Sequence, residues 1–294
     1  MSSGKSWQYS LAEWSIRNSL RIWRGVAFRK NRIRLDILLL IPAASGVKVK
    51  TQNSDLRGEW YEPPNSSPDR VLLYFHGGGY AGGSARSHRA MVSRLAKASG
   101  CLTFSAGYRL SHEAPWPAAL EDALASYQAL RQQHPGKRIF LAGDSAGGGL
   151  CLALLHRLNP EDEKPAGLCL FAPWLNLRMD HPETREIQKL DPMLKLEELQ
   201  LYGECYAGKA SIDEPTISPG KAALPEKLPL LIQAGTHDLL YPDIRDWVQE
   251  QESQGFHPEF SVWPAMMHVW QAAIFPPESA RAIREAGAWI ARQS

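Results

Sequence analysis

Short, unbroken runs of apolar residues alternate with helical segments from about residue 55 onward. Continuous apolar runs are typical of strands buried on both faces, and helices between them indicate β-α-β units around a parallel sheet. We therefore expect an α/β fold with a mostly parallel central sheet and helices on both of its faces. The predicted strands are 71–75, 101–105, 138–142, 167–171, 230–234 and 260–263, and the predicted helices are 87–99, 117–131, 146–157, 194–206 and 278–292.

The composition is that of an ordinary globular protein. Hydrophobic residues make up 44% of the 294 residues and charged residues 22%, which excludes a disordered chain, a collagen and a coiled coil. A chain of this length buries enough surface to fold without a disulfide or a structural metal. The four cysteines lie too far apart for a C-x-x-C pair, and we expect buried thiols in a reducing compartment.

The first fifty residues differ from the rest in charge. They contain ten Lys and Arg against two acids, a net charge of +8 in a chain whose total is +2. Trp14, Arg17, Arg21 and Arg24 recur at helical spacing, which predicts a helix with a solvated basic face. Interleaved aromatic and basic residues also occur in proteins that bind nucleic acid or anionic membranes. No recognition-module signature accompanies them, and we expect no nucleic-acid partner.

The apolar run 37–41 is the longest near the start of the chain, and it is far shorter than the roughly 20 residues that span a membrane. It is also too short, and begins too late, for a signal peptide. The expectation is a cytoplasmic protein without a membrane span.

The most informative motif is Gly143-Asp144-Ser145-Ala146-Gly147, a G-x-S-x-G sequence between a predicted strand and a predicted helix. That context predicts a sharp turn that holds the Ser145 hydroxyl above the sheet, at the positive end of the helix. The two glycines allow the strand and the helix to approach each other closely. Ser145 is therefore a candidate nucleophile.

A second motif, His76-Gly77-Gly78-Gly79-Tyr80, directly follows the strand 71–75. Attack by Ser145 on a carbonyl creates an oxyanion, which needs fixed N–H donors where its charge develops. Glycines leave their N–H groups uncovered and tolerate unusual dihedral angles. We expect the donors to be the backbone amides of Gly77, Gly78 and Ala146.

The same glycines match the G-x-G-x-x-G pattern of a dinucleotide site. Such a site requires an acid about 20 residues further on, and there is no acid between Asp69 and Glu113. The histidines are scattered singly and form no H-E-x-x-H motif, so no metal site is indicated. We expect no cofactor.

A serine nucleophile needs a base to take its proton and an acid to orient that base. In a parallel sheet such groups come from loops at the carboxyl ends of strands. Asp238 follows the strand 230–234 by a short loop. Asp243 is the rival acid, but it follows Pro242 and would more simply start a helix. We favour Asp238.

Three histidines follow predicted strands at this edge of the sheet. His268 comes just after the last strand and completes the order Ser, Asp, His. His237 adjoins Asp238, a poor geometry for a hydrogen bond between the two side chains. His76 opens the glycine loop, and we expect it to brace that loop. The predicted base is therefore His268.

In these motifs the sequence resembles the hormone-sensitive-lipase family of α/β-hydrolases, the bacterial family IV esterases. The likeness covers about residues 47–294. The matching motifs are His76-Gly77-Gly78-Gly79-Tyr80, Tyr108-Arg109-Leu110, Pro117-Ala118-Ala119-Leu120-Glu121-Asp122, Gly143-Asp144-Ser145-Ala146-Gly147-Gly148, Asp191-Pro192-Met193 and Met267-His268.

The resemblance implies an α/β-hydrolase catalytic domain over 51–294 and a helical cap built from 1–50 and 174–212. It implies Ser145 as nucleophile, His268 as base and Asp238 as orienting acid, with the oxyanion donors named above. The Trp-rich start of the chain would turn its apolar face to the acyl pocket and its arginines to water. Dimers among similar proteins make a homodimer a further expectation.

These features together predict a serine carboxylesterase that hydrolyses short- to medium-chain acyl esters of small molecules through an acyl-enzyme. Two other functions stay open. An amidase or deacetylase would use the same triad, and the sequence does not separate it from an esterase. A ligand receptor on this fold, like the gibberellin receptors, would lack a working catalytic histidine, and the presence of His268 argues against it.

Overall fold

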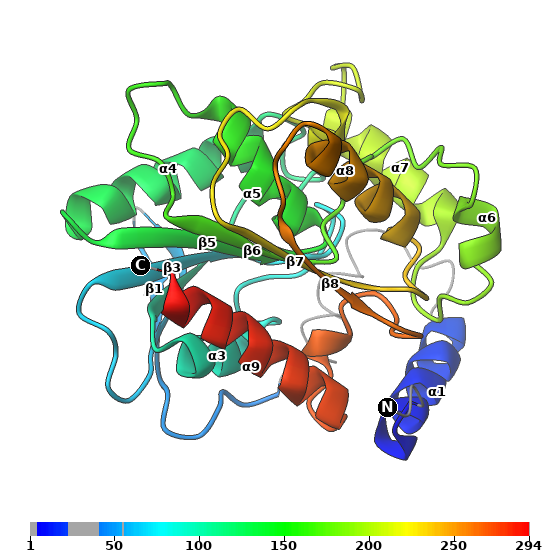
Figure 1. Cartoon of the computed structure of the whole chain (residues 1–294), viewed down its shortest axis with the longest axis horizontal. Coiled ribbons are helices and arrows are strands. Elements are labelled where there is room, and N and C mark those ends of the chain that lie inside the picture. The colour runs from blue at the N-terminus through cyan, green and yellow to red at the C-terminus, as the bar shows by residue number, and fades with distance from the viewer. Residues whose placement is uncertain (1–4, 23–40, 55, 294) are drawn as a thin grey trace.

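The computed structural model describes residues 5–22, 41–54 and 56–293. Its centre is an eight-stranded sheet with the order β1-β2-β4-β3-β5-β6-β7-β8, and the predicted α/β fold is confirmed (Figure 1). The strands are β1 (Lys48–Asn53), β2 (Arg57–Glu62), β3 (Arg70–Phe75), β4 (Leu102–Ala106), β5 (Arg138–Asp144), β6 (Gly167–Phe171), β7 (Leu230–Gly235) and β8 (Glu259–Trp263).

Each helix predicted from residue 87 onward is present, with ends that differ by at most two residues. The helices are α1 (Trp7–Ile22), α3 (Arg89–Ser99), α4 (Ala118–Gln133), α5 (Ala146–Arg157), α6 (Thr184–Ile187), α7 (Leu196–Ala207), α8 (Tyr241–Ser253) and α9 (Pro277–Arg292), with short 3₁₀ turns at Pro219–Lys221 and Trp270–Ala272.

The sheet is parallel except at one edge. Strands β4, β3, β5, β6, β7 and β8 pair in parallel, whereas β1 pairs antiparallel with β2, and β2 with β4. Sequence analysis missed β1 and β2. They lie at the edge of the sheet and expose much of their length, so they carry polar residues in place of a continuous apolar run.

Helices cover both faces of the sheet. Figure 1 shows α4, α5 and α8 on one side and α3 and α9 on the other. Successive side chains of β3 alternate between the two cores: Leu73 and Phe75 pack with the first group of helices, and Leu72 and Tyr74 with the second. The strand is thus apolar throughout because both of its faces are buried.

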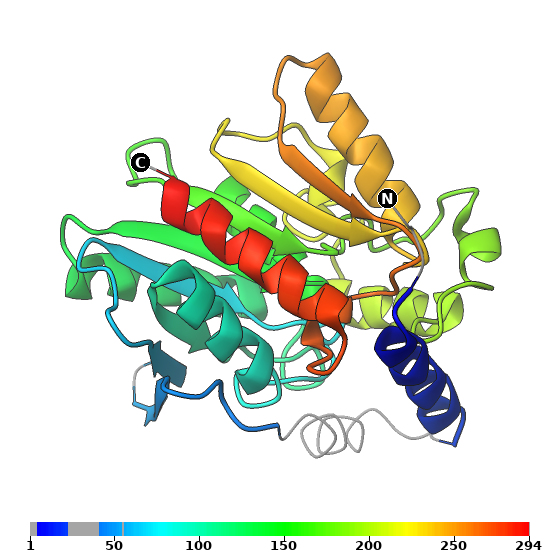
Figure 2. The same cartoon turned by 60° about the horizontal axis from the view of Figure 1, so that its bottom comes forward.

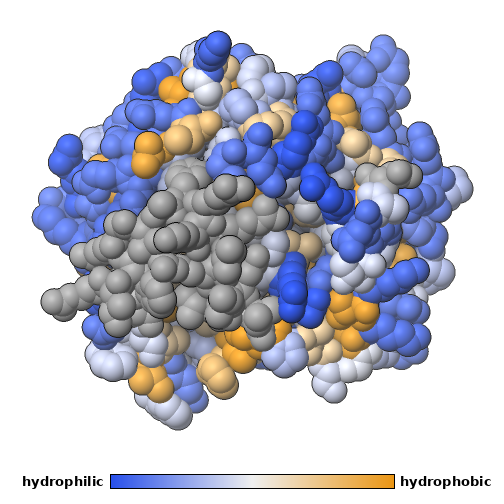
Figure 3. Space-filling model, turned by 180° about the vertical axis from the view of Figure 1, so that it is seen from behind, coloured by the Kyte–Doolittle hydropathy of each residue, from blue (hydrophilic) through white to orange (hydrophobic). Residues whose placement is uncertain are grey.

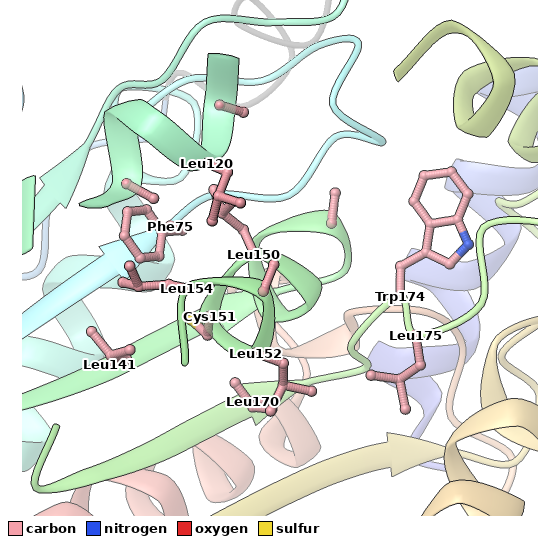
Figure 4. Close-up of a cluster of buried hydrophobic side chains, with 14 of the residues drawn as sticks. Phe75, Leu120, Leu141, Leu150, Cys151, Leu152, Leu154, Leu170, Trp174 and Leu175 are labelled. Atoms are coloured by element: carbon pink, nitrogen blue, oxygen red, sulfur yellow. The ribbon is translucent and has the colours of Figure 1, made fainter. Parts of the chain in front are cut away.

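The core beside α5 lies directly behind the turn that carries Ser145. Figure 4 shows Leu150 and Leu154 of this helix with Phe75 and Leu141 of the sheet, and all four side chains are fully buried. Close packing on this scale resists displacement. The first turn of α5 therefore has a rigid support.

Helix α1 stands beside the N-terminal end of α9, away from the sheet (Figure 2). Tyr9 faces the protein and is buried in a small cluster with Trp263, Met266, Met267, Trp270 and Ala282. Trp7 and Trp14 lie on the other side of the helix and are 72% and 63% exposed. The inner side of the helix is formed by Tyr9 and Ile16. The exposure of Trp14 agrees with its predicted place on the solvated face of the helix.

The predictions about Arg24 and most of the apolar run 37–41 concern residues outside the described ranges. Among the helices that the structure does describe, none has the length and apolar character needed to cross a membrane. Figure 3 shows hydrophobic residues interspersed with hydrophilic ones on one face of the molecule.

Candidate active site

The loops that carry the predicted site residues lie at one edge of the sheet. Strands β3, β5, β7 and β8 run parallel, so their carboxyl ends share that edge. The glycine loop follows β3, Ser145 follows β5, Asp238 follows β7 and His268 follows β8. Segments far apart in the sequence are thereby brought together.

Ser145 sits between β5 and α5 in a strained backbone conformation. Its φ and ψ are 52° and −122°, and a positive φ is uncommon for a residue with a side chain. The turn is held by hydrogen bonds from Ser145 N to the carbonyl of Phe171 (2.9 Å) and from Trp174 N to the carbonyl of Ser145 (2.9 Å). The predicted sharp turn is confirmed.

The glycines that flank Ser145 are required by close approach. A Cβ at Gly143 would lie 2.4 Å from the carbonyl oxygen of Gly147, and a Cβ at Gly147 would lie 2.0 Å from that of Phe75. No side chain fits such gaps. The strand, the helix and the start of the glycine loop are therefore packed backbone against backbone around Ser145.

The glycine loop is anchored by Asp144, the residue before Ser145. Its Oδ1 accepts hydrogen bonds from Gly77 N (3.0 Å) and from the Tyr74 hydroxyl (2.6 Å), and its Oδ2 lies 3.3 Å from His88 Nε2. Burial opposes ionisation of Asp144, but the adjacent His88 and these hydrogen bonds keep the pKa of its carboxyl below the usual value.

This anchor corrects one of the predicted oxyanion donors. The N–H of Gly77 is already directed at the Asp144 carboxylate, so it is not available to an oxyanion at Ser145. Within the described residues, the amides of Gly78 and Gly79 donate to no other group. The pattern of glycines in the sequence does not reveal that Asp144 takes the N–H of the first, and for that reason Gly79 was not a candidate there.

His76 braces the glycine loop, as expected. Its Nδ1 lies 2.8 Å from the carbonyl oxygen of Gly77, and its ring stacks on Tyr108 at 4.3 Å. The Tyr108 hydroxyl in turn donates to the carbonyl of His76 (2.6 Å). The loop is therefore held by contacts within the protein.

Asp238 and His268 form a buried pair. The Oδ2 of Asp238 lies 2.9 Å from Nδ1 of His268, and the exposed fractions of the two residues are 0% and 4%. Asp238 also accepts a hydrogen bond from Leu240 N (2.9 Å). This contact fixes the orientation of the imidazole and leaves its Nε2 as the ring nitrogen that can face a nucleophile.

The surroundings of His268 favour its charged form. Burial opposes ionisation, but the charge of Asp238 and the hydrogen bond to it outweigh burial and raise the pKa of His268 above its usual value. The charges of Asp191 and Asp144 act in the same direction. No hydrogen bond joins Ser145 to His268 in the described ranges.

The rival residues are placed elsewhere. Asp243 lies in the first turn of α8 and accepts a hydrogen bond from Asn176 Nδ2 (2.9 Å), away from His268. His237 is partly buried, and burial lowers its pKa. Its backbone N donates to the carbonyl of Met266. Within the described residues the Asp238 carboxylate bonds to His268 and Leu240 and not to the His237 ring. The choice of Asp238 and His268 as partners agrees with this geometry.

One buried carboxylate beside the pair was not assigned a role from sequence. Asp191, from the Asp191-Pro192-Met193 motif, accepts a hydrogen bond from Leu239 N (2.8 Å), the residue after Asp238. Its place in that motif was the only available signal, since it lies almost fifty residues from Asp238 in the chain. No cluster of three or more His, Cys, Asp or Glu that could hold a metal ion occurs in the part of the chain that the structure describes.

Taken chemically, the arrangement places a hydroxyl at the N-terminal end of a helix, unpaired amides beside it and an oriented imidazole at the same edge. Those are the components of nucleophilic acyl transfer. Each is held by backbone packing or by buried hydrogen bonds, as a preorganised site requires.

Comparison with known proteins points to ester hydrolysis. Residues 72–272 match a family model of the alpha/beta hydrolase fold. An acetyl-hydrolase of Streptomyces hygroscopicus is 38% identical over 236 residues, which cover 79% of this chain and 78% of the relative. An esterase of Acinetobacter venetianus is 30% identical over 278 residues, which cover 92% and 91%.

The structure is also similar to a crystal structure of an esterase from the bacterial hormone-sensitive lipase family. The TM-score is 0.93 at 32% sequence identity, and the alignment covers 99% of both chains. The similarity therefore extends to both ends of the described structure.

Proposed function

The chain belongs to the hormone-sensitive-lipase family of α/β-hydrolases, and from that premise we propose that Ser145, His268 and Asp238 are its catalytic triad. It is a carboxylic ester hydrolase. The observation that carries the proposed triad is the buried 2.9 Å contact between Asp238 and His268, at the edge of the sheet where Ser145 adopts a positive φ.

In the proposed mechanism His268 takes the hydroxyl proton of Ser145 as this oxygen attacks the ester carbonyl. Asp238 keeps the imidazole in place and stabilises the imidazolium that forms. His268 then gives the proton to the departing alcohol, which leaves an acyl-enzyme. Water activated by the same imidazole attacks the acyl-enzyme and releases the acid.

We propose the amides of Gly78, Gly79 and Ala146 as the donors to the tetrahedral oxyanion. Gly78 and Gly79 adopt positive φ values of 121° and 63°, which orient their peptide planes as residues with side chains rarely do. Ala146 is the first residue of α5, where a backbone N–H has no partner within the helix. Gly77 acts as the anchor to Asp144.

The proposed cap comprises residues 1–50 and 174–212 on a catalytic domain of 51–294. Two contacts support it. A Cβ at Gly79 would lie 2.8 Å from the ring of Tyr202 in α7, so this helix lies over the glycine loop. The Tyr9 hydroxyl of α1 accepts a hydrogen bond from Met267 N (2.6 Å), next to His268.

We propose short- to medium-chain acyl esters as substrates. An aromatic ring from α7 against the glycine loop limits the space beside the proposed oxyanion donors. The similarity to an acetyl-hydrolase favours the smallest acyl groups and keeps deacetylation as the second candidate activity.

The test is hydrolysis of p-nitrophenyl esters from acetate to palmitate by the parent, by Ser145→Ala and by Ser253→Ala as a matched control. The Ser253 hydroxyl is exposed and donates only to the carbonyl of Glu250. We expect activity to be highest for short chains, to be lost in Ser145→Ala by about 10⁴-fold or more, and to be unchanged in the control.

Labelling by a fluorophosphonate, read by peptide mass spectrometry, identifies the nucleophile directly. Modification at Ser145 is expected. A Ser145→Ala variant that is as active as the parent, or a label on another residue, would contradict the proposed mechanism.

A further inference from the structure

Asp191 lies behind the His268–Asp238 pair and is fully buried. Its Oδ1 accepts hydrogen bonds from Met193 N (2.8 Å) and Leu194 N (3.0 Å), and its Oδ2 accepts one from Leu239 N (2.8 Å). The first two partners precede α7, and the third follows Asp238. One carboxylate therefore joins the segment between α6 and α7 to the loop that holds the proposed triad acid.

The hydrogen bonds of Asp191 indicate that it is ionised in the resting protein. All three partners are N–H donors, and a protonated carboxyl would instead have to donate one proton. Burial and the charge of Asp238 raise its pKa above the usual range, and the nearby His268 acts in the opposite direction. Tyr9 of α1 is a further titratable group that interacts with Asp191. Arg17 of the same helix reaches the carbonyl of Leu190.

We propose that Asp191 is a positioning residue for the triad assigned under the proposed function, which it serves by holding the Asp238 loop in place and by adding a second negative charge behind His268. The backbone bond to Leu239 fixes the loop at the residue after Asp238, while Asp238 itself bonds to Leu240 and His268. Asp191 touches no reacting atom. It acts through the imidazole.

The charge has a direct consequence for the reaction. His268 gains a proton as the tetrahedral intermediate forms, and a second carboxylate nearby stabilises that imidazolium. The charge of Asp191 is one of the influences that raise the pKa of His268. Removing it is therefore expected to lower both the basicity of the imidazole and the rate of the step that protonates it.

The decisive experiment is an NMR titration of the His268 imidazole in a Ser145→Ala background, with Asp191→Asn or Asp191→Ala added. We expect either variant to lower the His268 pKa by about one unit. In the Ser145-containing enzyme the same variants should lower kcat about tenfold with little change in KM, and should move the acid limb of the pH profile to lower pH.

Two further variants separate positioning from a merely structural role. Asp191→Glu keeps the charge and is expected to hold the His268 pKa near the parent value, whatever it does to thermal stability. Asp243→Asn is the matched control, because Asp243 is a partly buried carboxylate that also has a raised pKa but bonds to Asn176. It should leave the His268 titration unchanged.

An unchanged His268 pKa in Asp191→Asn and Asp191→Ala, with a loss of melting temperature alone, would overturn the proposal. So would an equal shift in Asp243→Asn. The titration does not depend on turnover, so it decides the role of Asp191 even if the p-nitrophenyl series and Ser145→Ala disprove the esterase mechanism.

Discussion

The imidazole of His268 must be neutral to take a proton, whereas its surroundings favour the protonated form. His268 is buried, yet the charge of Asp238 outweighs burial and raises the pKa of the imidazole above its usual value. A base with a pKa near or above neutrality transfers protons efficiently in the middle of the pH range. Under the proposed mechanism, the same raised pKa sets the pH below which activity is lost.

We predict that kcat/KM falls as the pH decreases, at a higher pH than for an ordinary histidine. The protonated imidazole cannot accept the Ser145 proton, and a raised pKa means that protonation begins at a higher pH. The measurement is the pH profile of kcat/KM for a p-nitrophenyl ester. Asp238→Asn should reduce kcat/KM and move the acid limb of its pH profile to lower pH, because the imidazole loses the adjacent negative charge. If the acid limb does not move, a group other than His268 is responsible for it.

At the scale of elements, helix α1 is joined to the loop of His268 by one buried hydrogen bond. The Tyr9 hydroxyl accepts from Met267 N at 2.6 Å, and Ser6 at the start of the helix donates to the Glu278 carboxylate of α9. These contacts attach the helix at two points. The proposed cap therefore supports the catalytic loop from outside the sheet.

Tyr9→Phe should reveal this support. It removes the oxygen that accepts the Met267 amide and leaves a buried N–H without a partner, which costs about 1–3 kcal/mol of unfolding free energy. We expect urea unfolding to show that loss and kcat to fall, because the neighbouring His268 is less firmly held. Ser10→Ala, on the exposed side of α1, serves as control, and equal stability of Tyr9→Phe and parent would rule out the support.

At the scale of the whole molecule, the helices α3 and α9 form one layer on the sheet and touch almost backbone to backbone. A Cβ at Gly287 would lie 2.4 Å from the Cβ of Ala98 and 2.5 Å from its carbonyl carbon. Nothing larger than glycine fits there without moving a helix. This contact sets how closely the layer packs on the sheet.

Gly287→Ala is predicted to lower the unfolding free energy by about 1–3 kcal/mol, as overpacking usually does. The sign of the change in unfolding free energy is informative, because replacing glycine by alanine in an isolated helix would stabilise the helix by about 1 kcal/mol. Urea unfolding measures the effect, and adding Ala98→Gly should restore part of the loss. A stabilised single variant would show that the helices can separate at little cost.

The features of the fold and the candidate site that depend on local chemistry could be predicted from the amino-acid sequence. The apolar runs predicted six strands, the G-x-S-x-G context predicted the turn at Ser145, and the order of loops after strands led to Asp238 and His268. Each inference used residues close together in the chain, where periodicity, turn propensity and packing of small residues act directly.

The hydrogen bonds between residues far apart in the chain could not be predicted from the sequence and are seen only in the folded molecule. The N–H of Gly77 goes to Asp144, the carboxylate of Asp191 reaches the Asp238 loop, and Tyr9 meets Met267 across most of the chain length. The polar edge strands β1 and β2 likewise acquire their role only by pairing with β4 and each other. Hydrogen-bond partners are chosen by proximity in space, and a linear pattern of residue types does not encode that proximity.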